Sequence, residues 1–161
     1  MNLFGKSGRR LKGVAEIPEY VLDASVAVKW HLRDEEHAAL ALQILRDFRE
    51  GRVGLLAPDH ICYEVASAVQ VAVLRDRITV EEGRSSLADF YGWGIPTVRG
   101  ESLIFFAYDQ ALKLHCSFYD ALYLALAQSA NAPLISADEK LRHTIGQDFP
   151  LALWIEDYRA R

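Results

Sequence analysis

The chain has 161 residues, a length that suits one domain with a full hydrophobic core. Half of the residues are hydrophobic and a quarter are charged, which is typical of a globular protein and not of a disordered one. The formal net charge of −4 argues against a protein that holds nucleic acid by overall charge alone. Any nucleic-acid substrate must therefore be bound locally.

Three features bear on where the protein works. The longest apolar stretch, residues 61–74, contains Glu64 and Gln70 and is too short to cross a bilayer, so no membrane association is expected. Residues 1–19 lack the pattern of a secretory signal, and we predict a flexible extension there, before one domain over 20–161. Cys62 and Cys116 lie in apolar helical patterns and predict two buried free thiols, which favours a cytoplasmic location.

The predicted elements alternate between strands and helices along the chain. In chain order they are a strand over 20–22, helices over 24–32 and 35–50, a strand over 53–57, helices over 58–75 and 79–91, a strand over 95–98, helices over 102–115 and 117–130, a strand over 134–136, a helix over 139–145 and a strand over 151–155. Pro58 is expected to open its helix, and Thr79 with Glu82 forms a capping box. This order predicts an α/β fold, a three-layer sandwich with a mainly parallel central sheet flanked by helices.

Four acidic residues occupy positions that need an explanation. Asp23 follows the first predicted strand directly, and Asp138 follows the strand over 134–136 by one residue. The carboxyl ends of parallel strands are where ligand sites form in such sheets, so both acids are expected at one rim. Glu64 and Asp120 instead interrupt apolar helices, where an unpaired carboxylate would cost several kcal/mol.

Each acid also has a purely structural interpretation. Asp23 and Asp138 can cap the helices that follow them, and Asp120 fits the S-x-x-D capping box that starts at Ser117. Glu64 can pair with an arginine or lie at a partly exposed edge. The joint pattern favours a metal site, because Mg²⁺ is bound by carboxylate oxygens and no buried lysine or arginine in these elements matches the acids. The chemistry that such a site indicates is metal-assisted phosphodiester hydrolysis.

Three segments of the chain resemble a known family. VLDASVAVKW, LAPDHICYEVASAV and SFYDALYLALAQSANAPLISADEKL are similar, in order and spacing, to the signature blocks of PIN-domain proteins, in particular VapC-type toxins. The resemblance covers residues 20 to about 155, nearly the whole chain after the extension, and implies a PIN-like sandwich.

The resemblance also implies an activity and a site. It implies a ribonuclease dependent on Mg²⁺ or Mn²⁺, whose catalytic and metal-binding residues are Asp23, Glu64, Asp120 and Asp138. Ser25 and Ser136 are implied as polar helpers near the metal. For VapC-type members it further implies an RNA substrate, a VapB-type antitoxin that holds the toxin inactive, and a homodimer.

Other functions remain as alternatives. A housekeeping RNA-processing nuclease of the same fold, without an antitoxin, fits the same residues, and so does a non-catalytic nucleic-acid-binding module, although none of the four acids is missing. A phosphotransferase site would need D-x-D, where this chain has Asp23-Ala24-Ser25. The five histidines are expected to be exposed or cap-like. Several basic residues are candidates to rim the site and contact RNA, namely Arg75, Arg77, Arg84, Arg99, Lys113, Lys140 and Arg142.

Overall fold

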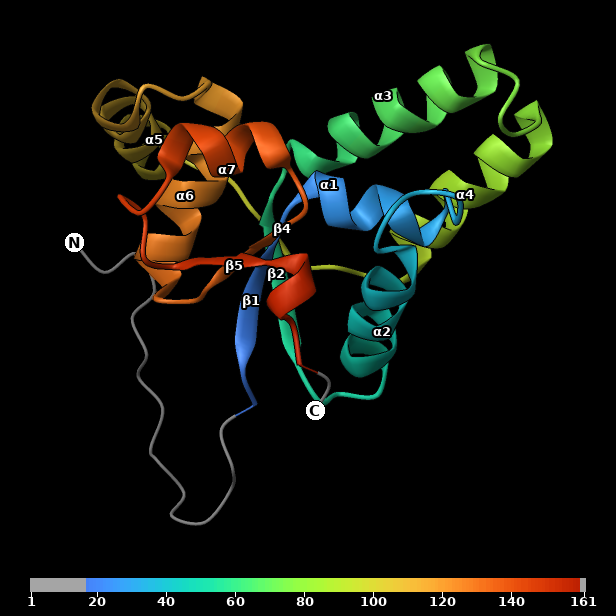
Figure 1. The fold of residues 1–161 in the computed structure, drawn as a ribbon, viewed down its shortest axis with the longest axis horizontal. Helices are drawn as coiled ribbons and strands as arrows, with labels where there is room; N and C mark the ends of the chain where they lie inside the picture. Colours follow the sequence, from blue (N-terminus) through green and yellow to red (C-terminus); the bar gives the residue numbers. More distant parts are fainter. Residues whose placement is uncertain (1–16, 160–161) are drawn as a thin grey trace.

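The computed structural model describes residues 17–159 and arranges them around a five-stranded sheet (Figure 1). The strands are β1 (Glu19–Leu22), β2 (Gly54–Pro58), β3 (Thr97–Val98), β4 (Leu134–Ser136) and β5 (Ala152–Trp154). Their order is β3-β2-β1-β4-β5, and every neighbouring pair is parallel. The predicted α/β architecture is confirmed. Of the extension predicted over 1–19, residues 1–16 lie outside the described part.

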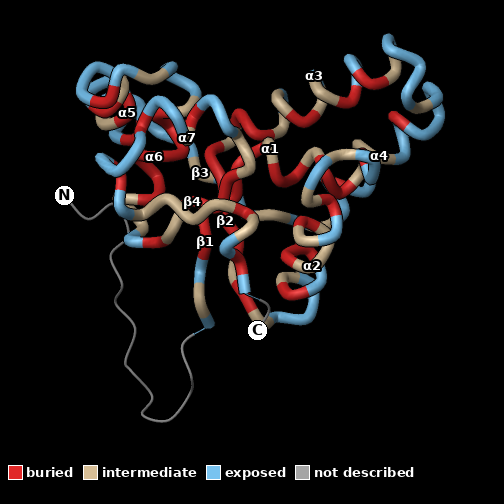
Figure 2. The backbone as a smooth tube through the Cα atoms, viewed as in Figure 1, coloured by how far each residue is buried: buried red, intermediate tan, exposed pale blue. Residues whose placement is uncertain are grey.

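Helices cover both faces of the sheet. They are α1 (Ala24–Ala27) with the 3₁₀ turn η1 (Val28–Trp30), α2 (Ala38–Arg49), α3 (Ile61–Leu74), α4 (Val80–Gly92), α5 (Glu101–Leu114), α6 (Phe118–Ala130), α7 (Glu139–Ile145) and the 3₁₀ turn η2 (Ile155–Asp157). Helices α1 to α4 lie on one side and α5 to α7 on the other (Figure 1). Helix α6 and the central strands are the most buried elements (Figure 2). Among residues 17–159, no helix has the length and apolarity needed to cross a membrane.

One predicted helix boundary is wrong. Pro58 does not open α3 but ends β2, where it pairs with Val98 of β3. Proline has no N–H to donate, and the ladder here does not need one. The N–H groups of its neighbours, Ala57 and Asp59, donate instead to Pro96 and Val98 at 3.0 Å each. Helix α3 therefore begins three residues after Pro58, at Ile61.

Helices α3 and α4 form a hairpin that projects from the sheet (Figure 1). The predicted capping box at the start of α4 is present, because the Thr79 hydroxyl accepts from Glu82 N and the Glu82 carboxylate accepts from Thr79 N. Gly83 lets the two helices approach closely. A Cβ atom at this position would lie 3.0 Å from Cγ2 of Val73, so a side chain here would require Val73 to shift.

The two central strands position the functional site. Leu22 of β1 pairs with Ile135 of β4, so the next residues along each strand, Asp23 and Ser136, lie side by side. The chain runs from β1 towards β3 on one side and from β4 towards β5 on the other. The edge between β1 and β4 is therefore the switch point of the sheet, where ligands bind in open α/β folds.

Candidate functional site at the β1–β4 switch point

Asp23 is the buried acid at the end of β1. It caps α1, and its carboxylate accepts from Ser25 N at 3.4 Å, from the Ser25 hydroxyl at 2.9 Å and from the Ser136 hydroxyl. Burial raises the pKa of Asp23 from 3.8 to about 6, against the two serine hydrogen bonds, and the nearby charge of Glu64 adds to the rise. The charged form of such a buried carboxyl group is stabilised by any cation that enters the site.

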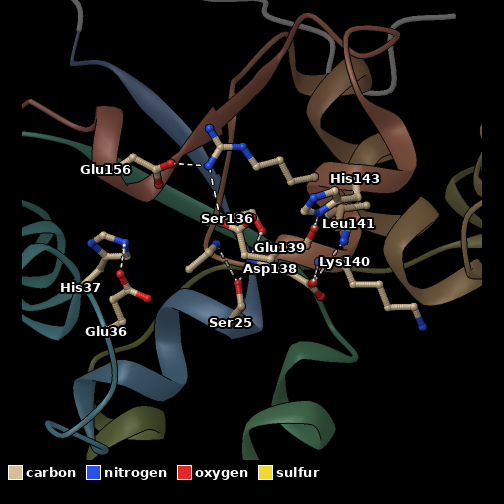
Figure 3. A network of polar contacts seen from close by, with 12 residues as sticks. Ser25, Glu36, His37, Ser136, Asp138, Glu139, Lys140, Leu141, His143 and Glu156 are labelled. Atoms are coloured by element: carbon tan, nitrogen blue, oxygen red, sulfur yellow. Dashed lines mark hydrogen bonds and ion pairs between the residues drawn. The ribbon is translucent and has the colours of Figure 1, made fainter.

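Two serines connect Asp23 to the strand end that carries Asp138. The Ser25 hydroxyl accepts from Ala137 N at 2.9 Å, and the Ser136 hydroxyl accepts from Asp138 N at 3.1 Å. Asp138 in turn caps α7, because its Oδ1 accepts from Lys140 N and Leu141 N at 2.8 and 3.0 Å (Figure 3). The cap interpretation of Asp138 is thus correct, and the second carboxylate oxygen takes no part in the cap.

Glu64 reaches the same region from α3, on the opposite wall. Its side chain is 37% exposed, and its Oε2 accepts a 2.5 Å hydrogen bond from the Tyr123 hydroxyl of α6. Nε2 of His60 lies 3.3 Å from the same oxygen. Burial alone would raise the pKa of Glu64, but His60 and Tyr123 outweigh it and lower this pKa. The carboxylate therefore stays ionised, and its partners are not the arginine that the structural interpretation expected.

Asp120 stands apart from the other three acids. It lies in the first turn of α6, where its backbone N–H donates to the Ser117 hydroxyl at 3.1 Å. The return bond of a capping box, in which Ser117 N would donate to the Asp120 carboxylate, is not formed among the described residues. Among the described residues, Glu64 and Asp138 line a common cleft, and Asp120 does not. Its carboxylate is half-buried and remains available as a metal ligand.

A cleft of about 480 Å³ opens over these residues. Its walls come from α1 and η1, from α3, and from the start of α7, and the loop before α2 closes one end. The lining residues are Ala24, Ser25, Val28, Lys29, Glu35, Glu64, Ala68, Ala137, Asp138, Glu139 and Lys140. Glu64 and Asp138 thus line one cleft, and Asp23 lies beneath it through its bonds to Ser25 and Ser136.

The donor set fits a hard divalent cation in its chemistry. Asp23, Glu64 and Asp138 supply carboxylate oxygens, and Ser25 and Ser136 supply hydroxyls, which are the ligand types that Mg²⁺ and Mn²⁺ prefer. Their arrangement is more open than a finished coordination sphere. Within residues 17–159, no group of three or more His, Cys, Asp or Glu side chains is close enough together to hold an ion as it stands.

Three functional neighbours of the acids were not recognised from the sequence. His60 was expected to be exposed or cap-like, but it is buried against the rings of Tyr119 and Tyr123, with centroids 5.5 and 4.8 Å away. A signal was present, since His60 and Glu64 are one helical turn apart. The sequence analysis singled out neither Tyr123 nor Lys29, and Lys29 is buried although no buried lysine was expected in these elements. Cys62 and Cys116 are free thiols, as predicted, but they are half-buried.

The basic residues expected around the site mostly lie elsewhere. Of that set, Lys140 lines the cleft, and its side chain extends away from Asp138 (Figure 3). Arg77 is bound to Asp34 and Glu35, and Arg142 to Glu139 and Glu156. These two arginines hold loops in place and are not free to form a rim of positive charge.

Comparisons with known proteins give a matching family model and several similar sequences. The model of the PIN domain family matches residues 20–146. Ribonuclease VapC1 of Mycobacterium tuberculosis is 36% identical over 85 residues, which are 53% of this chain and 63% of that protein. Ribonuclease VapC12 of the same organism is 30% identical over 133 residues, which are 83% of this chain and 97% of that protein. The match thus spans less than two thirds of VapC1 but nearly all of VapC12.

A solved structure gives the same fold. The crystal structure of PAE2754 from Pyrobaculum aerophilum superposes with a TM-score of 0.63 at 20% identity, and the match covers 86% of this chain and 92% of that one. At this identity the likeness concerns the fold alone.

Proposed function

Because this chain belongs to the PIN-domain family, we propose that it is a metal-dependent ribonuclease that hydrolyses RNA phosphodiester bonds. The observation that supports this most directly is the common position of Asp23, Glu64 and Asp138 around one open cleft at the switch point of the sheet. The relatives VapC1 and VapC12 carry the name ribonuclease.

The proposed metal is Mg²⁺ or Mn²⁺, held by Asp23, Glu64 and Asp138 with Asp120 as the fourth acid. When bound, such an ion supplies an activated water and stabilises the leaving oxygen of the phosphodiester. The chain's own residues orient the ligands. The hydroxyls of Ser25 and Ser136 both donate to Oδ2 of Asp23, and the α7 cap uses Oδ1 of Asp138 alone.

Cleavage of RNA by the purified protein tests this proposal. We expect cutting in Mg²⁺ or Mn²⁺, no cutting in EDTA, and loss of most activity in Asp23→Asn. Equal cutting in chelator would remove the metal mechanism. Because ligands of one ion act together, combining Asp23→Asn with Glu64→Gln should add little to either loss. Independent, multiplicative losses would argue against a single site.

We further propose that the protein is the toxin of a VapC-type toxin–antitoxin pair, acting in the cytoplasm and held inactive by a VapB-type partner. Both named relatives are VapC ribonucleases, which supports this biology. Expression of the chain without an antitoxin should then arrest growth of the host, and Asp23→Asn should relieve the arrest. Robust growth with soluble, RNA-cutting protein would instead favour a housekeeping nuclease.

A homodimer is the proposed assembly. Helix α5 carries an exposed apolar stripe with helical spacing, formed by Ile104, Phe105, Tyr108 and Leu112. A run of four large apolar side chains on one exposed helix face is more than isolated surface residues normally amount to. Burial of this stripe against a second copy would remove it from water, and the C2 arrangement would place the same stripe on both sides.

A further inference from the structure

Lys29 is an unexplained charge in the cleft. Its side chain is only 11% exposed, although lysine is rarely buried without a close partner. Lys29 lines the cleft together with Lys140, but Lys140 is exposed and Lys29 is not. A lysine whose side chain is largely buried in the wall of a cleft is more confined than a surface lysine, and the position of its ammonium is better defined.

The partner of Lys29 is too distant to satisfy it. Its Nζ lies 3.7 Å from Oε2 of Glu35, beyond hydrogen-bond distance, and it donates no hydrogen bond to any residue in the described part of the chain. Glu35 has a closer partner in Arg77, whose Nη2 lies 2.7 Å from its Oε1. The same Arg77 nitrogen contacts both carboxylate oxygens of Asp34 at 2.9 Å. Lys29 thus donates no hydrogen bond within residues 17–159, while Arg77 binds Glu35 and Asp34.

The location of Lys29 relates it to the acids. Ser25 and Lys29 are four residues apart in the α1–η1 segment, so they lie on one helical face, and both line the cleft. Ser25 binds the Asp23 carboxylate directly. The ammonium of Lys29 is therefore one turn along the wall from the residue that holds the central acid.

The cleft carries several negative charges, so a phosphate would need a positively charged group there. Four carboxylates line it, those of Glu35, Glu64, Asp138 and Glu139, and Asp23 lies beneath. An RNA backbone entering this cleft meets negative charge, and metal ions offset it only where they bind. A fixed ammonium on the wall would hold a phosphate oxygen by a charge-assisted hydrogen bond.

From these observations we propose that Lys29 binds a phosphate of the RNA substrate and that Glu35, held by Arg77, positions it. This inference rests on the proposed ribonuclease function. The competing explanation is that Lys29 only neutralises Glu35. The two differ in what happens when both charges are removed together, because a structural pair can be deleted jointly whereas a phosphate ligand cannot be replaced in that way.

The test measures binding of an end-labelled single-stranded RNA by fluorescence anisotropy over a series of KCl concentrations. The buffer contains Ca²⁺, and each sample is checked to confirm that the RNA has not been cut. The proteins are wild type, Lys29→Met, Lys29→Arg and the double variant Lys29→Met/Glu35→Gln. Lys113→Met, an exposed lysine on α5 that does not line the cleft, is the matched control. Circular dichroism melting reports folding of each variant.

We expect Lys29→Met to weaken binding about tenfold at low salt. It should also reduce the slope of log Kd against log salt by about 0.7, the loss of one phosphate contact to a single strand. The double variant should keep the reduced slope of Lys29→Met, Lys29→Arg should keep the wild-type slope, and Lys113→Met should match wild type.

An unchanged slope in Lys29→Met, or a wild-type slope in the double variant, would overturn the role of Lys29. If Lys29→Met does not fold, the folded double variant decides the same question through its slope. Failure of wild type to cut RNA in Mg²⁺ or Mn²⁺ would instead count against the proposed function, and the salt slopes would still report on Lys29. The two failures are therefore distinguishable.

Discussion

The Tyr123 hydroxyl donates a 2.5 Å hydrogen bond to Oε2 of Glu64, and this bond connects the buried helix α6 to the cleft wall on α3. Burial raises the pKa of Tyr123 well above its ordinary value, with the charges of Asp23 and Glu64 adding to the rise, so the hydroxyl remains a proton donor. The ring of His60 packs against Tyr123 and places its Nε2 near the same Glu64 oxygen. Glu64 is thus oriented by two residues that do not line the cleft.

Tyr123→Phe should therefore weaken metal binding without unfolding the protein. The ring stays in the core, and the loss of one hydrogen bond to a charged group costs about 1.5–3 kcal/mol at most. We expect a lower apparent affinity for Mn²⁺ and a lower kcat, with the KM for RNA little changed. Mn²⁺ titration of the cleavage rate measures this. An unchanged Mn²⁺ dependence would leave Tyr123 with a packing role alone.

The stability of the metal-free protein should depend on pH through Asp23. Its pKa is raised from 3.8 to about 6 on folding, chiefly by burial, so the folded state binds this proton more tightly than the unfolded state. The associated stabilisation is complete below pH 3.8 and is lost as the pH rises through about 6. The loss amounts to about 3 kcal/mol, since each pKa unit is worth roughly 1.4 kcal/mol.

Asp23→Asn removes this titration and is the matched control. In EDTA, the variant should be more stable than wild type near neutral pH, and the difference should shrink as the pH falls towards 4. Urea unfolding at several pH values measures both curves. A difference between the two proteins that does not vary with pH would contradict the raised pKa of Asp23.

Variants of Ser117 and Asp120 distinguish the role of a helix cap from that of a metal ligand. The Ser117 hydroxyl accepts from Asp120 N, so Ser117→Ala should cost about 1 kcal/mol and leave the response to Mn²⁺ intact. The Asp120 carboxylate forms no cap bond, so Asp120→Asn should be as stable as wild type in EDTA. As a metal ligand, Asp120 should matter when Mn²⁺ is added, because an ion that binds only the folded state adds about 2.7 kcal/mol at a hundredfold excess over its Kd.

Thermal melting with and without Mn²⁺ distinguishes the two outcomes. Asp120→Asn should start no lower than wild type and gain much less from Mn²⁺. A variant that melts lower in EDTA yet gains as much as wild type would assign Asp120 to the helix and remove it from the four-acid site.

Tyr158→Phe should reduce stability but not activity. Asp47 of α2 is fully buried, and its carboxylate accepts from the Tyr158 hydroxyl at 2.5 Å and from Arg52 and Gln43. These bonds outweigh burial and lower the pKa of Asp47. Removing one donor to a buried charge should cost about 1–3 kcal/mol. Urea unfolding measures the loss, and a matching fall in kcat of the folded enzyme would show that this network also supports the site.

Phe105→Glu should make the protein monomeric if the α5 stripe is the dimer surface. A charge in the middle of this stripe would be buried in the dimer without a partner, at a cost of several kcal/mol, but would be solvated in the monomer. Light scattering after size exclusion reports the mass. Lys113→Glu, on the same helix, is the charge control. A dimeric Phe105→Glu would move the interface elsewhere, and a monomeric wild type would remove the dimer proposal.

Local sequence determined most of the secondary structure. Apolar runs, caps such as Thr79 with Glu82, and glycines at helix ends act within a few residues, so their effect can be inferred without the fold. The same holds for Asp23 and Asp138, because a residue that directly follows a parallel strand must lie at the carboxyl edge of the sheet. The prediction that Pro58 opens a helix was wrong for the opposite reason. Only the neighbouring strand β3 shows that the ladder tolerates a proline there.

Contacts between distant segments decided the rest. The bond from Tyr123 to Glu64 joins residues 59 positions apart, and neither helix signals the other in its own pattern. Lys29 has an ordinary place in its sequence segment, and its burial depends on elements from elsewhere in the chain, such as α2 and α3, that pack against η1. The availability of the Asp120 carboxylate likewise depends on side-chain rotation, which spacing does not encode. Strand ends and caps are set by neighbours in sequence, whereas burial, orientation and pKa are set by whatever the fold brings near.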